Sequence, residues 1–190
     1  TPEAFLDLAF RALPAESDEQ MISRVLGYSS STWWRFMGTA GRAAHAKQYE
    51  AVLRDGLSRA ETPSRKAAWF GALRQTVVTP GTLLWLEQIW EKKESVAGLP
   101  LLALDLAVRS PDRASHILNT QLSRIENPDR RARFGFVMPA LSAGRSERDR
   151  WFASLREVAN RRREPWVLEG LTYLHHPLRA AESAGYVRPS

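Results

Sequence analysis

The stretch SPDRASHILNTQLSRIENPDR, residues 110–130, contains one complete helical unit and the start of the next. It opens on Ser110-Pro111, and Asn127-Pro128 marks the following start. A polar residue before proline is typical of a helix start, because its side chain accepts a hydrogen bond from a free backbone N–H and proline has no N–H to leave unpaired. Between the two starts lie apolar residues at helical spacing, namely Ala114, Ile117, Leu118, Leu122 and Ile125. The stretch therefore predicts an amphipathic helix, a short turn and a second helix.

The same signals recur along the chain. The further starts are Thr62-Pro63, Thr79-Pro80, Ser146-Glu147, Glu164-Pro165 and a capping box of Ser17 with Gln20. A second apolar stripe has the same offsets as the first and consists of Tyr49, Val52, Leu53, Leu57 and Ala60. From Thr62 onward the starts are almost evenly spaced, except for a much longer gap between Thr79 and Ser110. That longer gap predicts one unmarked helix start near Gly98.

Helices of this length with short connections lie antiparallel to their neighbours, and pairs of them stack into solenoids. We therefore expect an all-α fold, an α-α superhelix of about ten helices in stacked antiparallel pairs, similar to HEAT and armadillo repeats. We expect residues 1–190 to form a single helical-repeat domain that is part of a longer chain. An irregular helical bundle is the alternative. The alternation typical of strands is confined to residues 76–79, which run directly into Pro80.

Composition excludes several classes of protein. The 190 residues are 44% hydrophobic and 25% charged, as in a domain with its own core. The longest run without a charge, residues 75–86, is shorter than the roughly 20 residues of a membrane-spanning helix, so we expect no membrane span. The chain has no cysteine, which excludes disulfides, thiol nucleophiles and zinc sites with sulfur ligands. Neither the cytoplasm nor the periplasm is excluded.

Motifs of an active site are absent. The sequence has no H-E-x-x-H zinc motif, no Gly-rich phosphate loop and no G-x-S-x-G nucleophile elbow. Its histidines are His45, His116, His175 and His176. The last two are adjacent and point about 100° apart on a helix, so they are poorly placed to share a metal ion, and we interpret them as residues of a helix C-terminus. We expect no catalytic, cofactor-binding or metal-binding residue in this chain.

Basic residues are concentrated in the second half. The net charge is +6, and the segment from Arg130 to Arg163 contains ten arginines and only three acidic residues. Arg130 and Arg133, one turn apart after a predicted helix start, share a face and are candidates to bind a carboxylate or phosphate. The alternative is that these arginines bond acids or carbonyls of an adjacent helical repeat.

Four runs of sequence resemble the C-terminal helical region of bacterial zinc aminopeptidases of the aminopeptidase N type. They are RIENPDR (124–130), FVMPALS (136–142), EPWVLE (164–169) and YLHHPLR (173–179). Residues 13–14, 18–19, 34–36 and 86–90 are similar to earlier parts of the same region. The similarity extends over most of the chain and is densest from residue 86 to residue 179.

The resemblance implies a non-catalytic role. In that family a β-rich domain and a thermolysin-like zinc domain precede the helical domain, which packs over the zinc domain, closes the substrate chamber and helps to select peptides. In several relatives a basic residue of the helical domain contacts the terminal carboxylate of the substrate. The partners implied are therefore the catalytic and N-terminal domains of the same polypeptide, together with peptide substrates. Zinc is the cofactor of the parent enzyme, and none is expected in this chain.

Two other functions remain open. A freestanding helical-repeat scaffold that binds proteins is the first, because solenoids present extended binding surfaces. Binding of nucleic acid through the basic segment 130–163 is the second, since phosphate contacts need clustered Arg and Lys.

Overall fold

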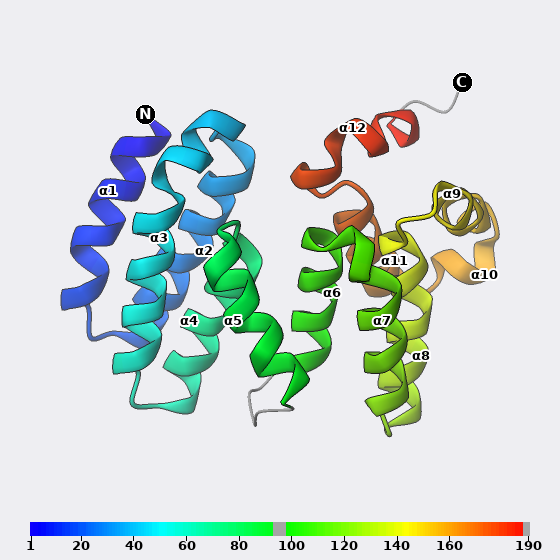
Figure 1. Cartoon of the computed structure of the whole chain (residues 1–190), viewed down its shortest axis with the longest axis horizontal. Coiled ribbons are helices and arrows are strands. Elements are labelled where there is room, and N and C mark those ends of the chain that lie inside the picture. Colours follow the sequence, from blue (N-terminus) through cyan, green and yellow to red (C-terminus); the bar gives the residue numbers. More distant parts are fainter. Residues whose placement is uncertain (93–97, 188–190) are drawn as a thin grey trace. The chain divides into compact units, whose positions relative to one another are not determined.

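The computed structural model describes residues 1–92 and 98–187, and within these ranges it contains the α-helices α1 to α12, several 3-10 helices and no strand (Figure 1). The all-α prediction is confirmed. The chain divides into two compact units, Thr1–Ala97 and Gly98–Ser190. A single superhelical domain over residues 1–190 stays a prediction. No helix within the described ranges is both long and apolar enough to cross a membrane.

Unit 1, Thr1–Ala97, is built from α1 to α5. Their bounds are α1 Pro2–Ala12, α2 Glu19–Arg35, α3 Thr39–Arg59, α4 Pro63–Thr76 and α5 Pro80–Glu91. Helix α2 packs against both α1 and α4, and α3 packs against α4 and α1. Each helix of the pair α1–α2 therefore touches a helix of the pair α3–α4, and the arrangement as a superhelix stays a prediction.

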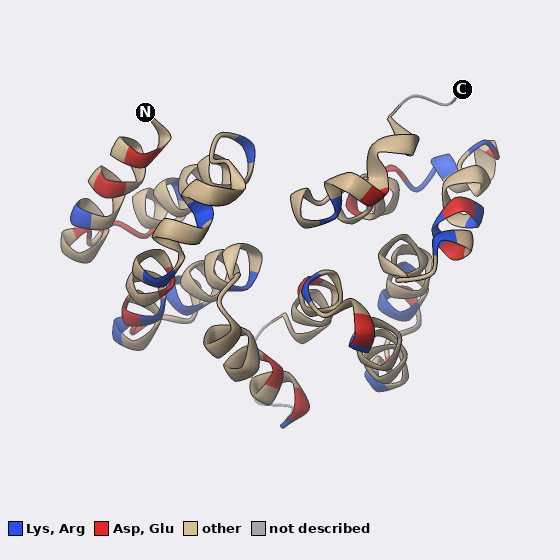
Figure 2. Cartoon of the chain, turned by 45° about the horizontal axis from the view of Figure 1, so that its top comes forward, with Lys and Arg blue, Asp and Glu red and all other residues tan. Residues whose placement is uncertain are grey.

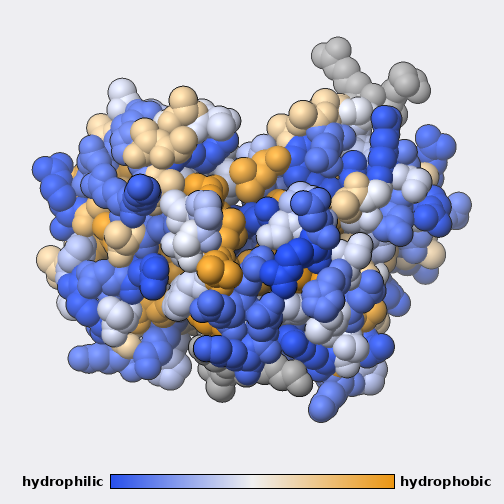
Figure 3. Space-filling model, in the orientation of Figure 1, coloured by the Kyte–Doolittle hydropathy of each residue, from blue (hydrophilic) through white to orange (hydrophobic). Residues whose placement is uncertain are grey.

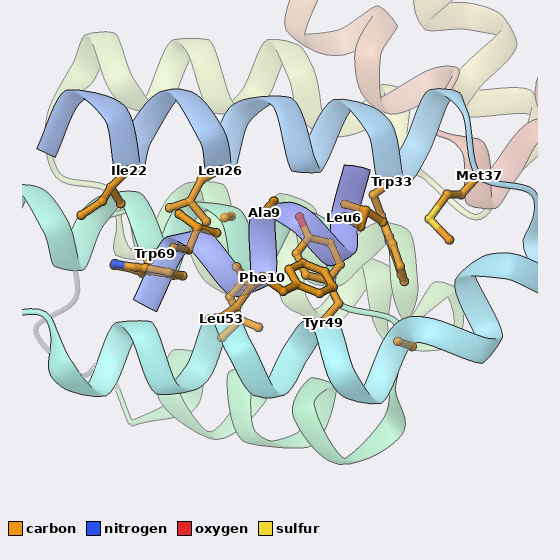
Figure 4. Close-up of a cluster of buried hydrophobic side chains, with 14 of the residues drawn as sticks. Leu6, Ala9, Phe10, Ile22, Leu26, Trp33, Met37, Tyr49, Leu53 and Trp69 are labelled. Atoms are coloured by element: carbon orange, nitrogen blue, oxygen red, sulfur yellow. The ribbon is translucent and has the colours of Figure 1, made fainter. Parts of the chain in front are cut away.

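An aromatic cluster forms the centre of the unit 1 core (Figure 4). The ring of Tyr49 lies 4.9 Å from the ring of Phe10 and 4.9 Å from that of Trp33, centroid to centroid. Leu53, one turn after Tyr49 on α3, is fully buried beside them. The apolar stripe of residues 49–60 thus faces the core as predicted. Because the phenol of Tyr49 is buried, its pKa is raised above the ordinary value of 10.0.

A buried carboxylate holds the start of α5. Glu50 of α3 is only 3% exposed, and its Oε1 accepts hydrogen bonds of 2.8 Å from the backbone N–H groups of Val78 and Thr79. The hydroxyl of Thr79 donates to the other carboxylate oxygen. A buried charge is tolerated only when several donors satisfy it, and the turn before α5 supplies three.

Unit 2, Gly98–Ser190, contains α6 to α12 and the short 3-10 helices between them. The bounds of its helices are α6 Leu99–Arg109, α7 Ala114–Arg124, α8 Pro128–Val137, α9 Arg145–Ser154, α10 Val158–Arg161, α11 Glu164–Leu174 and α12 Ala180–Ser183. Helix α6 packs against α7, and α11 packs against α8 and against the 3-10 helix Met138–Leu141. The predicted stripe of α7 is buried at Ala114, Ile117 and Leu118.

Several predicted helix starts are confirmed. Helix α4 begins at Pro63 with the Thr62 hydroxyl accepting from the N–H of Arg65, and α8 begins at Pro128 with the Asn127 side chain accepting from the N–H of Arg130. The unmarked start near Gly98 is also present. Gly98 precedes α6 with φ = 99°, a left-handed conformation that glycine adopts without strain.

Three predicted starts need correction. Asp18, not Ser17, caps α2, because its side chain accepts from the N–H of Met21. Ser110-Pro111 opens a 3-10 helix instead of α7, which begins shortly afterwards at Ala114. Helix α9 begins at Arg145, after Gly144, so Ser146 is already inside it. In each case the sequence offers two or three candidate positions within one turn, and the contacts of the folded chain select one of them.

Two glycines allow a tryptophan to lie directly on a helix backbone, one in each unit. A Cβ added at Gly56 of α3 would lie 2.5 Å from the ring of Trp69, and one added at Gly170 of α11 would lie 2.2 Å from the ring of Trp151. Trp151 also donates from its indole nitrogen to the carbonyl oxygen of Phe136 at 2.8 Å. The contact between Gly170 and Trp151 fixes α11 against α9, and α11 also carries a residue of the site described next.

Candidate anion-binding site

A cavity of about 250 Å³ lies within unit 2 and brings together four helical segments. Its wall consists of Gly98, Pro100, Leu101 and Leu104 at the start of α6, Ile125 after α7, Arg130, Arg133 and Phe134 of α8, and Glu169 of α11. Most of this lining is apolar, and the charged groups come from α8 and α11. Both sequence-predicted residues, Arg130 and Arg133, therefore line the same cavity.

Arg133 already has a partner on the cavity wall. Its Nε donates to Oε2 of Glu169 at 2.7 Å, which joins α8 to α11. The Arg133 side chain is 49% exposed and that of Glu169 is 13% exposed, so the pair sits at the boundary between the cavity and solvent. The hydrogen bond to Glu169 raises the pKa of Arg133 above its ordinary value. Since a half-exposed ion pair contributes only about 0–1 kcal/mol, we interpret it mainly as a positioning contact between α8 and α11.

Arg130 differs from Arg133 because its guanidinium has no hydrogen bond or ion pair with any residue in the described ranges. Its backbone N–H is used to cap α8, where it donates to Asn127 at 2.9 Å. The side chain is exposed at the cavity wall. The nearby start of α6 has no side-chain cap, so the partial positive charge of that helix end adds to the field of Arg130. One free guanidinium, that of Arg130, thus lies beside the largely apolar cavity.

The other arginines of the basic segment largely bond to this chain. Arg131 donates to the carbonyl oxygen of Leu122 at 2.9 Å, Arg150 donates to that of Ser146 at 3.2 Å, and Arg163 lies over the ring of Trp166. Figure 2 shows basic positions on the helices of unit 2 with acidic positions among them, and much of the face in Figure 3 is hydrophilic. The second interpretation of the arginines, as partners of neighbouring helices, therefore holds for Arg131 and Arg133 and not for Arg130.

Sequence reasoning missed the other half of the cavity. In the sequence Glu169 is only one residue of the run EPWVLE, and Leu101 and Leu104 show no signal beyond their apolar character. Their role depends on how α6 and α11 pack beside α8, which no local pattern contains. The one sequence signal at Glu169 is an acidic residue on a half-apolar helix face, opposite in charge to Arg130 and Arg133.

The histidines take structural positions. His175 is the C-cap residue of α11, as the sequence predicts, and Nδ1 of buried His176 accepts from the N–H of Leu178 at 3.2 Å. His45 lies in α3 and His116 in α7. Across residues 1–92 and 98–187, no three His, Asp or Glu side chains are grouped as metal ligands would be.

In comparisons with known proteins, no family model, no curated protein and no solved structure matches this chain.

Proposed function

We propose that the chain is a non-catalytic peptide-binding domain, the C-terminal helical domain of a zinc aminopeptidase, which closes the substrate chamber and helps to select peptides. Two lines of reasoning support this. The first is the resemblance of the runs at 124–130, 136–142, 164–169 and 173–179 to that region of aminopeptidase N-type enzymes. The second is the free guanidinium of Arg130 at the wall of an apolar cavity, and this single observation carries the proposal.

The cavity suits one end of a peptide. At about 250 Å³ it is smaller than the roughly 300–1,000 Å³ typical of small-molecule sites, so it matches one apolar side chain better than a complete ligand. In the proposed complex, Leu101, Leu104 and Phe134 contact that side chain. The terminal carboxylate binds the guanidinium of Arg130, whose five N–H donors suit a carboxylate.

Glu169 contributes to selection in this scheme. Because its carboxylate is bonded to Arg133, its repulsion of an incoming carboxylate is reduced but not removed. An acidic side chain entering the cavity would meet Glu169, whereas an apolar one would not. The domain should therefore favour peptides that end in an apolar residue with a free carboxylate.

Zinc belongs to the proposed parent enzyme and not to this chain. No step of the role proposed for this chain passes through a metal. The chemistry of peptide hydrolysis would be supplied by the preceding domain, where the H-E-x-x-H motif and a downstream glutamate ligand are expected.

Peptide titration of the chain tests the role of Arg130. A pentapeptide ending in leucine is compared with the same peptide amidated at its C-terminus, and affinities are measured by calorimetry. We expect the free acid to bind at least tenfold more tightly, because a charge-assisted hydrogen bond contributes roughly 1.5–3 kcal/mol. Arg130→Gln should remove this preference. Arg162→Gln, which removes an exposed charge outside the cavity, should keep it.

Two results would refute the proposal in different ways. Equal affinity of the chain for the free acid and the amide would exclude the carboxylate contact at Arg130. So would an equal loss of the preference for the free acid in Arg130→Gln and Arg162→Gln. A coding sequence without H-E-x-x-H ahead of Thr1 would exclude the aminopeptidase parent and favour a freestanding peptide-binding scaffold.

A further inference from the structure

A second pair of arginines in unit 2 shares no residue with the cavity. Arg148 of α9 and Arg179, at the end of the 3-10 helix Pro177–Arg179, both have side chains only 5% exposed. Nη1 of Arg148 donates to the carbonyl oxygens of Ser142 at 2.7 Å and Ala143 at 2.8 Å. Nη2 of Arg179 donates to the same Ser142 oxygen at 2.7 Å. One carbonyl thus brings two buried guanidinium groups together.

Glu182 is the carboxylate that both arginines share. Its Oε2 lies 3.2 Å from Nη2 of Arg148 and 3.4 Å from Nη2 of Arg179. The Glu182 side chain is 49% exposed, so it reaches the pair from the solvent side. Nη1 of Arg179 is buried and has no hydrogen-bond partner. The pair therefore has more donors than its own acceptors satisfy.

The charges around the pair do not balance. Two further ionised groups on α9, Arg145 and Asp149, lie 3.6 Å apart and offset each other, and Asp149 also accepts from the Tyr186 hydroxyl. Two guanidinium groups consequently face one carboxylate. Burial lowers the pKa of Arg179, and repulsion from Arg148 lowers it further, but arginine remains protonated in proteins. An unbalanced buried charge is unfavourable unless an anion accompanies it.

We propose that Arg148 and Arg179 form a binding site for a phosphate-type oxyanion, which takes the place of the Glu182 carboxylate. The oxyanion would accept hydrogen bonds from Nη2 of Arg148 and from both Nη1 and Nη2 of Arg179. A tetrahedral dianion has more acceptor oxygens and more charge than one carboxylate, and the planar guanidinium forks match it. Glu182 is the residue that must move, and its half-exposed side chain needs only to rotate into solvent.

The site has a structural consequence within unit 2. Arg148 belongs to α9, whereas Arg179 and Glu182 belong to the segment after α11. A bound oxyanion would hold this segment to α9 through two residues at once. Its binding should therefore raise the stability of the folded chain, and the gain should grow as its concentration exceeds the Kd.

Inorganic phosphate is the probe for the test. Thermal unfolding of the whole chain is followed by circular dichroism at pH 7.5 in increasing sodium phosphate, with sodium chloride at matched ionic strength as the reference. We expect a saturable rise in Tm that chloride does not give. Glu182→Gln removes the competing carboxylate and should tighten phosphate binding at least tenfold. Arg179→Met should abolish the saturable rise.

The controls separate a binding site from a purely structural cluster. Arg150→Gln removes an exposed charge from the same helix, without freeing an acidic partner, and should leave phosphate binding unchanged. If Arg179→Met does not fold, Arg179→Lys keeps one positive charge but lacks the second donor and should weaken binding at least fivefold. A Tm that responds equally to phosphate in all variants would overturn the proposal. So would a Glu182→Gln variant that is destabilised and not restored by phosphate.

A second arm identifies the source of the group. Phenyl phosphate is titrated beside inorganic phosphate against the Glu182→Gln variant. Tighter binding of the ester would assign the site to the phosphate group of a larger ligand. Tighter binding of inorganic phosphate would assign it to the free ion, because the site would then have no room for a substituent.

Discussion

Replacing Gly170 with alanine tests whether Trp151 lies directly on the backbone of α11. The new methyl carbon would lie 2.2 Å from Cζ2 and 2.6 Å from Cη2 of the indole, whereas ordinary contacts begin near 3.4 Å. The ring must therefore move away from the helix before the methyl group fits. Trp151 is 6% exposed and hydrogen-bonded to Phe136, so it has little freedom to do so.

The expected magnitude follows from three contributions. Overpacking of a core costs about 1–3 kcal/mol. Stretching the bond between Trp151 and Phe136 adds up to about 1 kcal/mol. Alanine in a helix interior returns roughly 0.8–1 kcal/mol relative to glycine. The net destabilisation of Gly170→Ala should therefore lie between about 0 and 3 kcal/mol, with a midpoint of about 1.5 kcal/mol.

Urea unfolding followed by circular dichroism and tryptophan fluorescence provides the assay, and Gly135→Ala provides the matched control. Gly135 also lies inside a helix of unit 2, α8, but a Cβ there would meet only Leu122 Cδ1 at an ordinary 3.9 Å. Gly135→Ala should stabilise the chain by about 0.5–1 kcal/mol, so the two substitutions should act in opposite directions. Equal stability of the two variants would refute the close contact between Trp151 and α11.

Two further predictions concern unit 1. Glu50→Gln should lower the free energy of unfolding by about 2 kcal/mol, because it removes a charged acceptor from three donors, while exposed Glu61→Gln should change it by less than about 0.5 kcal/mol. Thermal melts check this pair, and equal effects would contradict the buried cap. Burial in the folded state raises the pKa of Tyr49. The stability that its neutral phenol gives the folded chain should therefore be complete below pH 10 and be lost as the pH rises above that value. In a spectrophotometric titration at 295 nm, Tyr49→Phe should leave the folded-state phenolate absorbance unchanged; a smaller absorbance than in the wild type would show that Tyr49 ionises freely.

Much of the helical pattern could be predicted from local chemistry. Thr62 and Asn127 cap the helices that follow them, because a side-chain oxygen next to Pro at the first helical position needs no distant partner. The one long gap in the otherwise even spacing of the starts also predicts the helix after Gly98. Thr79 shows the limit of this reasoning, since α5 begins where predicted but the Thr79 hydroxyl bonds to Glu50 of α3 instead of capping its own helix.

The candidate site could be predicted only in part. Arg130 and Arg133 are one turn apart, so any α-helix brings them to the same face, and both line the cavity. The pairing of Arg133 with Glu169 depends on the packing of α8 with α11. The same holds for Arg148 and Arg179, which are distant in sequence and meet at one carbonyl oxygen. Side-chain identity indicates that such groups need partners, but tertiary packing decides which partners they find.

The cap that Glu50 forms has a dynamic consequence. The amide hydrogens of Val78 and Thr79 both point to one carboxylate on α3, so neither can exchange with deuterium from solvent until that contact opens. The two amides should therefore exchange at closely similar rates and act as paired reporters of how often the start of α5 leaves α3.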